Sequence, residues 1–112
     1  MKYNGVELMV EDGAVALLIS HGWGAGWSTW NDPRLAYDKR VIEYFDSHPP
    51  KLSNKELDEA LNFIEGLGYR DVYMGGYNKI VKEYVKVGES FRIDEYDGNE
   101  TIFRSNDMMV FK

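Results

Sequence analysis

The chain has 112 residues, of which 44% are hydrophobic and 14% aromatic. This length fits one domain over residues 1–112 with a real hydrophobic core, and the composition excludes an intrinsically disordered chain. With 19 acidic against 13 basic residues the formal net charge is −6. This charge argues against a duplex nucleic acid as partner, because phosphate binding depends on lysine and arginine. The acidic excess fits either ordinary solubility or a surface that competes for a basic groove on another protein.

The absence of cysteine excludes disulfides and thiolate metal sites and agrees with a reducing compartment. No apolar run approaches the roughly 20 residues that cross a bilayer, and the first residues do not resemble a signal peptide. We therefore expect a cytoplasmic protein that makes no membrane contact. His21 and His48 have no evident partner for a zinc site or a nucleophile–base pair. No metal, cofactor or catalytic residue is expected.

The first half of the chain predicts one short strand and then helices. Residues 2–8 have the composition of a strand. Four apolar residues then fall at helical spacing: Val10, Ala14, Val15 and Leu18. We expect this first helix to be capped by Gly22, with His21 at the negative end of the helix dipole.

Two further helices follow in the sequence. The second is indicated by the spacing of Asp38, Val41, Ile42 and Phe45, and it is closed by Pro49 and Pro50, which cannot continue a helix. The third begins with a capping box, Ser53 followed by Glu56. Its apolar face consists of Leu57, Ala60, Leu61 and Ile64, and it ends near Gly66 and Gly68.

The second half changes to short runs rich in β-branched and aromatic residues. These runs predict strands at residues 69–74, 80–87, 90–96, 101–104 and 108–111. Glycines supply the turns, and Asp97-Gly98 is a strong hairpin signal. The sequence thus predicts an α+β domain, in which two to three N-terminal helices pack on one face of a C-terminal antiparallel meander of four to five strands.

All three tryptophans lie in a glycine-punctuated stretch, residues 21–31, which we call the tryptophan loop. Its indoles can close the core, or they can stack on a nucleotide base while glycine-rich backbone amides hold phosphate. The stretch has neither the Walker pattern nor the dinucleotide fingerprint. The loop residues predicted to bind a ligand are Trp23, Gly24, Gly26, Trp27, Ser28, Thr29, Trp30 and Asn31.

A second cluster, residues 92–100, is called the acidic hairpin. Its carboxylates do not match the ligand spacing of a calcium loop. Glu95 and Glu100 can perform acid–base chemistry if they face each other across the hairpin, but like charges in such positions are more often simply solvated. If the hairpin lies beside the tryptophan loop, Arg92 and Arg34 can meet a phosphate, and Asp94 or Glu95 can accept from a ribose or a base. Alternatively, Asp94, Glu95, Asp97 and Glu100 form a surface for a basic protein.

Both clusters, together with Gly68-Tyr69, Tyr73 and Gly75-Gly76, resemble a family of small uncharacterised bacteriophage proteins. The resemblance spans about residues 6–102. It implies an accessory binding protein that counteracts host defence, acting in the cytoplasm of the host cell, and it implies no catalytic residue.

Two functions remain open. The first is a binding module that sequesters a nucleotide-like small molecule through the tryptophan loop, either as a single chain or as a homo-oligomer. The second is an acidic, nucleic-acid-mimicking inhibitor of a host defence nuclease. A purely structural or interaction role, with the tryptophans in the core, is the third alternative, and an enzyme is placed last because no catalytic constellation is convincing.

Overall fold

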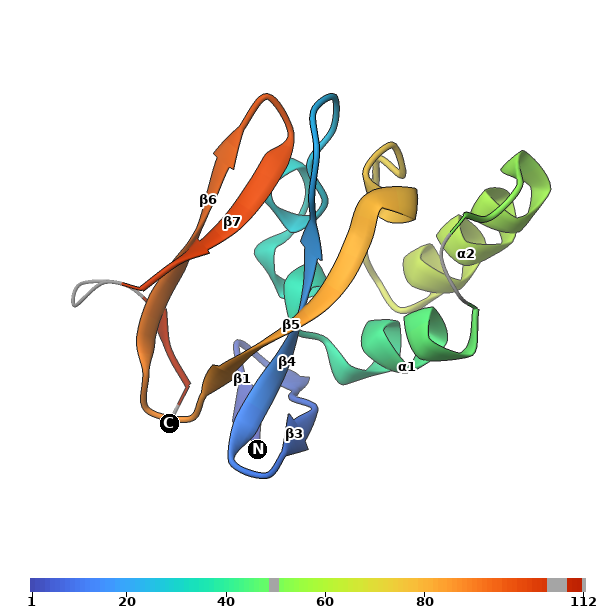
Figure 1. Ribbon diagram of the computed structural model, residues 1–112. Coiled ribbons are helices and arrows are strands. Elements are labelled where there is room, and N and C mark those ends of the chain that lie inside the picture. Colours follow the sequence, from blue (N-terminus) through green and yellow to red (C-terminus); the bar gives the residue numbers. More distant parts are fainter. Residues whose placement is uncertain (49–50, 105–108, 112) are drawn as a thin grey trace.

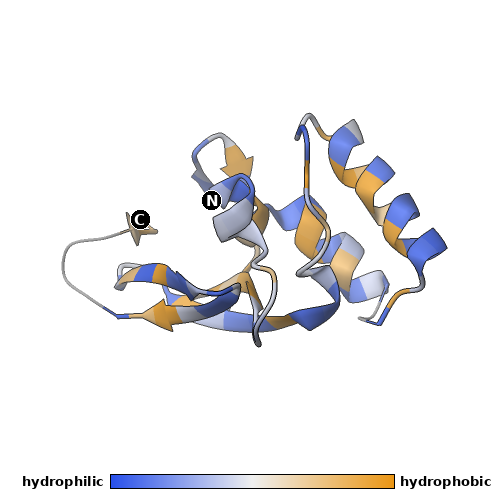
Figure 2. Cartoon of the chain, turned by 90° about the horizontal axis from the view of Figure 1, so that it is seen from above, coloured by the Kyte–Doolittle hydropathy of each residue, from blue (hydrophilic) through white to orange (hydrophobic). Residues whose placement is uncertain are grey.

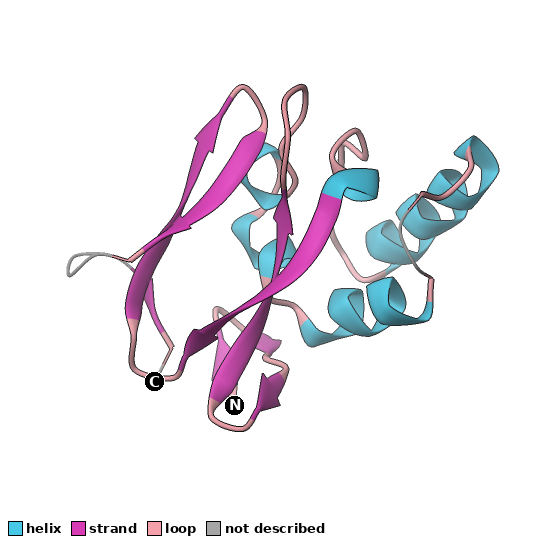
Figure 3. Cartoon of the chain, in the orientation of Figure 1, coloured by secondary structure: helices cyan, strands magenta, loops and turns pink. Residues whose placement is uncertain are grey.

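The computed structural model describes residues 1–48, 51–104 and 109–111. Within these residues, two α-helices and several antiparallel strands make an α+β fold (Figure 1). The two α-helices gather on one side of the molecule, next to the strands (Figure 3). The predicted fold class is confirmed.

The strands are β1 (Lys2–Tyr3), β2 (Val6–Glu7), β3 (Val10–Glu11), β4 (Ala14–Ser20), β5 (Ile80–Lys86), β6 (Ser90–Tyr96), β7 (Asn99–Phe103) and β8 (Met109–Val110). The helices are α1 (Lys39–Ser47) and α2 (Asn54–Gly66), with 3₁₀ turns η1 (Ser28–Trp30), η2 (Pro33–Ala36) and η3 (Tyr77–Lys79). The described strands form antiparallel sheets in the orders β1-β2, β3-β4-β5 and β7-β6-β8.

Strand β4 is the centre of the fold, and residues 15–20 are fully buried. Its alternate residues enter two hydrophobic clusters. Ala16 and Leu18 pack in the cluster that contains α1 and α2, whereas Leu17 and Ile19 pack in the cluster that contains Phe91. The predicted first helix is therefore wrong. A strand that is buried on both faces has a continuous run of apolar residues. The spacing of apolar residues in such a run does not distinguish a strand from a helix.

Tight turns at Asp-Gly pairs join consecutive antiparallel strands, β3 to β4 and β6 to β7. Asp12 and Gly13 have φ values of 51° and 77°, and Asp97 and Gly98 have values of 47° and 86°. Two successive positive φ angles fit the two-residue hairpin turn that favours Asp-Gly. The turn at Asp97-Gly98 is confirmed. Asp12-Gly13 is the local signal against a helix there, and a similar turn at Asn4-Gly5 divides the single strand predicted for residues 2–8 into β1 and β2.

The second and third predicted helices are confirmed as α1 and α2. Asp38 caps α1 by accepting a hydrogen bond from the Arg40 backbone N–H, and the capping box of Ser53 and Glu56 opens α2. Apolar and polar residues alternate along both helices in Figure 2. The predicted apolar residues turn inward, because Val41, Ile42, Phe45, Ala60 and Ile64 are buried. Pro49 and Pro50 lie outside the described residues.

The C-terminal strands are largely as predicted. Strands β5, β6 and β7 correspond to the runs 80–87, 90–96 and 101–104, and β8 pairs with β6 of the same chain. Met108, predicted to begin the last strand, lies outside the described residues. Residues 69–74 form no strand, which corrects that prediction. The backbone of Tyr73 is hydrogen-bonded to the Asn31 side chain rather than to a neighbouring strand.

Candidate functional site

The tryptophan loop lies against the acidic hairpin. The Gly24 N–H donates to the Asp97 carbonyl at 2.7 Å, and the Gly22 N–H donates to Asn99 Oδ1 at 2.9 Å. On the other side, Asn31 exchanges side-chain hydrogen bonds with the Tyr73 backbone at 3.0 and 2.8 Å. These contacts bring the two sequence clusters into one region.

Two glycines permit this close packing. A Cβ at Gly98 would lie 2.6 Å from the Ala25 Cα, and one at Gly76 would lie 2.6 Å from the Gly26 carbonyl oxygen. Both distances are well inside van der Waals contact with backbone atoms that cannot move aside. The tryptophan loop therefore packs closely between the acidic hairpin and the segment that precedes η3.

Glu100 organises the loop from within. Its side chain is fully buried, and Oε1 accepts from the Ser20 N–H at 3.0 Å. Oε2 accepts from the Trp27 N–H at 2.8 Å, from the Thr29 N–H at 3.0 Å and from Thr29 Oγ1 at 2.6 Å. These amides hold the chain's own carboxylate, so they are not free to cradle a phosphate as the sequence suggested. Glu100 is likewise removed from the acidic surface predicted to bind a partner.

The three tryptophans have different environments. Trp27 is fully buried, donates from Nε1 to the Leu35 carbonyl at 3.0 Å and packs edge-on against Tyr77. Trp23 is 63% exposed and meets Tyr96 edge-on, with its carbonyl accepting from Lys79 Nζ. Trp30 is 44% exposed and stacks on Tyr73. Trp27 is a core residue, and the other two belong to the surface.

A cavity of about 310 Å³ lies between the loop and strand β6. Its lining residues are Ser28, Thr29, Asn31, Pro33, Arg92, Ile93 and Met109. The structure thus brings together four of the residues that the sequence predicts to bind a ligand, namely Ser28, Thr29, Asn31 and Arg92. The tryptophans, Gly24, Gly26 and Arg34 do not line this cavity.

The apolar walls of the cavity, which are Pro33, Ile93 and Met109, were not predicted from the sequence. Nothing in their residue types marks them as functional. Ile93 is the residue after Arg92 on β6, and Arg92 was predicted to bind a ligand. This prediction was the sequence signal nearest to Ile93.

Arg92 supplies the positive charge of the cavity lining. Its Nε lies 2.6 Å from Asp94 Oδ1, and its guanidinium lies over the Phe103 ring, 4.5 Å from the centroid. The buried Nε makes this contact without the alignment of a hydrogen bond, and no other described group accepts from it. Arg92 is therefore held in place but has unused donor capacity.

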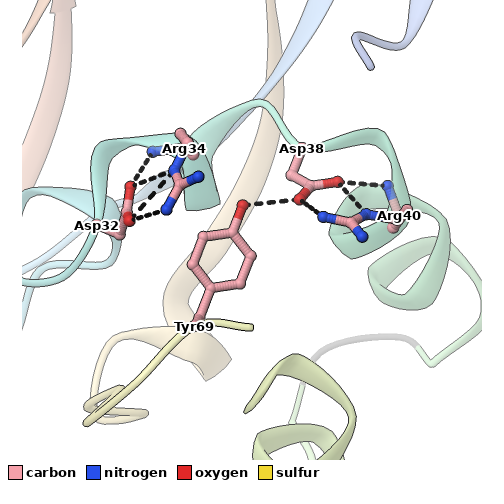
Figure 4. A network of polar contacts seen from close by, with 5 residues as sticks. All are labelled: Asp32, Arg34, Asp38, Arg40 and Tyr69. Atoms are coloured by element: carbon pink, nitrogen blue, oxygen red, sulfur yellow. Dashed lines mark hydrogen bonds and ion pairs between the residues drawn. The ribbon is translucent and has the colours of Figure 1, made fainter. Parts of the chain in front are cut away.

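Arg34 belongs to a different network (Figure 4). Its Nε and Nη2 donate to Asp32, with a shortest distance of 2.6 Å, and its guanidinium lies 5.1 Å from the centroid of the Tyr69 ring. The hydrogen bonds from Arg34 lower the pKa of Asp32 against the opposing effect of burial. This arginine does not join Arg92 as a second cation of the cavity.

The same network holds the start of α1. Asp38 is fully buried and accepts from Arg40 Nη2 at 2.8 Å and from Tyr69 Oη at 2.7 Å (Figure 4). Burial opposes the charge of Asp38, but the hydrogen bonds from Arg40 and Tyr69 together hold its pKa below the usual value. Burial and the Asp38 carboxylate raise the pKa of Tyr69. This network fastens the loop containing Tyr69 to the helix.

The remaining candidates are engaged in local contacts. Glu95 Oε2 accepts from the Gly98 N–H at 2.7 Å, and Asp97 forms the hairpin turn. His21 follows strand β4 instead of capping a helix, and its Nε2 lies 2.8 Å from Glu83 Oε2. His48 caps α1 and stacks on Tyr44.

Comparison with known protein families, curated protein sequences and solved structures found no match. Across residues 1–48, 51–104 and 109–111, no three histidine or carboxylate side chains are grouped so that they could hold a metal ion. No helix in this part of the chain is long and apolar enough to cross a membrane.

Proposed function

We propose that this protein binds a nucleotide-like small molecule in the cavity between η1 and β6. The observation that carries the proposal is the cavity of about 310 Å³ in which Ser28, Thr29 and Asn31 of the tryptophan loop face Arg92 of the acidic hairpin. In the phage setting implied by the sequence resemblance, sequestering such a molecule deprives the host of a defence messenger.

The cavity has the composition of a small-ligand site. Ligand pockets are mainly apolar with a few fixed polar groups, and their volumes run from about 300 to 1,000 Å³. Pro33, Ile93 and Met109 provide apolar surface for a flat base. The Ser28 hydroxyl can donate or accept, whereas the Thr29 hydroxyl donates its proton to Glu100 and can still accept. Arg92 matches an anionic oxygen. A volume at the lower end of this range favours one nucleotide unit over two.

Binding without chemical conversion agrees with the lining. Among its described residues there is no carboxylate and no imidazole, the usual general bases. Glu100 lies behind Thr29, but its oxygens are already occupied by four hydrogen bonds.

The acidic-inhibitor alternative has less support. Of its four proposed contact residues, Glu100 is buried, Asp94 is paired with Arg92, and Glu95 accepts from the hairpin backbone. A nucleic-acid mimic needs carboxylates directed outward to meet a basic protein. Asp97 alone of the four is exposed and without such an internal side-chain contact within the described part of the chain.

Thermal unfolding of the purified protein with a panel of nucleosides and nucleotides tests the proposal. A ligand at a hundred times its Kd adds about 2.7 kcal/mol of stability, which raises the Tm of a domain of this size by several degrees. Arg92→Ala should abolish the shift. Arg34→Ala is the matched control, because it removes an arginine that does not line the cavity, and it should retain the shift. If no member of the panel raises the Tm, the proposed function is wrong.

A further inference from the structure

We infer that the cavity selects a ligand carrying a single negative charge, and that this charge displaces Asp94 from Arg92. The inference rests on the proposed function and specifies the ligand class of the same site. It follows from the number of charges around the cavity and from the geometry of the Arg92–Asp94 pair.

Among the described residues that line the cavity, Arg92 is the one cation, and Arg34 is committed to Asp32. The buried Glu100 carboxylate lies directly behind Thr29 and occupies the loop amides. A second negative charge on a ligand would find no counter-charge among these described lining residues, and it would meet a protein with a net charge of −6.

The Arg92–Asp94 pair is easily opened. The side chains as a whole are 38% and 42% exposed, although the Nε of Arg92 is itself buried. Ion pairs between side chains this exposed contribute little to stability. The contact at Nε lacks hydrogen-bond alignment. Because the Phe103 ring lies over the guanidinium, the arginine keeps its position when Asp94 leaves, and its edge can hold a phosphodiester through two parallel hydrogen bonds.

Asp94 is thus an internal competitor of the ligand. Neutralising it should tighten binding, which is the reverse of the effect expected if Asp94 itself contacted the ligand or a basic partner. Any substitution that removes one negative charge also reduces the general repulsion between the protein and an anion. The tightening at Asp94 must therefore exceed the tightening caused by removing a negative charge elsewhere on the surface.

The experiment is isothermal titration calorimetry with a charge series built on one nucleoside: adenosine, 3′,5′-cyclic AMP, AMP and ATP. Guanosine, cytidine and uridine series are run in parallel to find the preferred base. Each series is titrated into the wild-type protein, Asp94→Asn and Asp46→Asn. Asp46→Asn is the matched control, because it changes the net charge by the same amount at an exposed ion pair with Lys82, and neither residue of that pair lines the cavity.

We expect the cyclic monophosphate, with one charge, to bind at least about tenfold more tightly than the nucleoside or the triphosphate. The nucleoside lacks the charge-assisted hydrogen bond to Arg92, and the triphosphate carries further charges that no cation among the described lining residues neutralises; each defect costs a factor of this order. Asp94→Asn should tighten binding of the cyclic monophosphate by about fivefold or more, and Asp46→Asn by less than about twofold.

Equal or tighter binding of AMP or ATP overturns the single-charge selection. Equal effects of Asp94→Asn and Asp46→Asn, or weaker binding to Asp94→Asn, overturn the displacement of Asp94. In both cases nucleotide binding itself stands. If no compound of any series binds, the proposed function fails, and the inference fails with it.

Discussion

Two kinds of aspartate–arginine pair occur in this protein, and they differ in how completely the carboxylate is bonded. Asp32 and Asp38 each precede their arginine by two residues at the start of a helical turn, and each accepts from the arginine backbone N–H as well as from its guanidinium. Asp94 follows Arg92 on strand β6, where the backbone N–H groups serve the sheet. In the two helix pairs, the aspartate is bonded to both the backbone and the guanidinium of its arginine. In the strand pair, Arg92 keeps an N–H donor without a hydrogen-bond partner among the described residues, and this donor can bond a ligand in the cavity.

Glu100 extends the comparison because it is the most fully bonded carboxylate of the site. Its four hydrogen bonds connect β4, the tryptophan loop and β7. The two larger sheets therefore meet through a side chain at this point. The arrangement predicts a descending order of stability effects from Glu100 through Asp38 to Asp94.

The largest effect is expected for Glu100→Ala. The substitution leaves the N–H groups of Ser20, Trp27 and Thr29 without their acceptor, and each buried unsatisfied donor costs about 1–3 kcal/mol. With partial relaxation we expect a loss of about 3–5 kcal/mol in the free energy of unfolding, measured by urea denaturation. Glu100→Gln retains one acceptor oxygen and should lose roughly half as much. A loss below about 1 kcal/mol for Glu100→Ala would contradict the role of Glu100 as organiser of the loop.

An intermediate effect is expected for Asp38→Asn. The amide keeps the size of the side chain but lacks the negative charge to which Arg40 and Tyr69 donate hydrogen bonds. We expect the free energy of unfolding to fall by about 1–3 kcal/mol near neutral pH. The pKa of Asp38 is lowered in the folded protein. Its stabilising contribution is therefore present above the unfolded pKa of about 3.9 and is lost as the pH falls through the folded value.

Urea denaturation of wild type and Asp38→Asn between pH 7 and pH 2.5 measures this dependence. The stability difference between the two proteins should be constant above about pH 5 and should shrink as the pH falls below about 4. Tyr69→Phe is the control that removes one hydrogen bond and keeps the carboxylate. A difference that stays constant down to pH 2.5 would show that the charge of Asp38 contributes nothing.

Elements with a strong local signal could be predicted from the sequence. The capping box at Ser53 and Glu56 opens α2, and the Asp97-Gly98 turn joins β6 to β7. Strand β4 could not be recognised from its period, because burial of both faces removes the alternation that marks a strand. Residues 69–74 have the composition of a strand, but their position is set by the side chain of Asn31, which is distant in sequence.

The candidate site was only partly predictable for the same reason. Ser28, Thr29, Asn31 and Arg92 were identified by residue type and now line one cavity. Glu100 was assigned to the surface because it lies in an acid-rich hairpin, whereas the packing of a loop more than 70 residues away buries it. Among three neighbouring tryptophans, no local feature distinguishes the buried Trp27 from the exposed Trp23 and Trp30.

The smallest effect on stability is expected for Asp94→Asn, and it is the most direct test of the comparison. Its carboxylate is 42% exposed and contacts one arginine, so the free energy of unfolding should change by no more than about 0.5 kcal/mol. Asp38→Asn makes the same chemical change in a helix pair and should cost several times more. Urea denaturation of both variants in one buffer measures the contrast. Equal losses would mean that the Arg92–Asp94 pair is as structural as the helix pairs, and Arg92 would then have no spare capacity to offer a ligand.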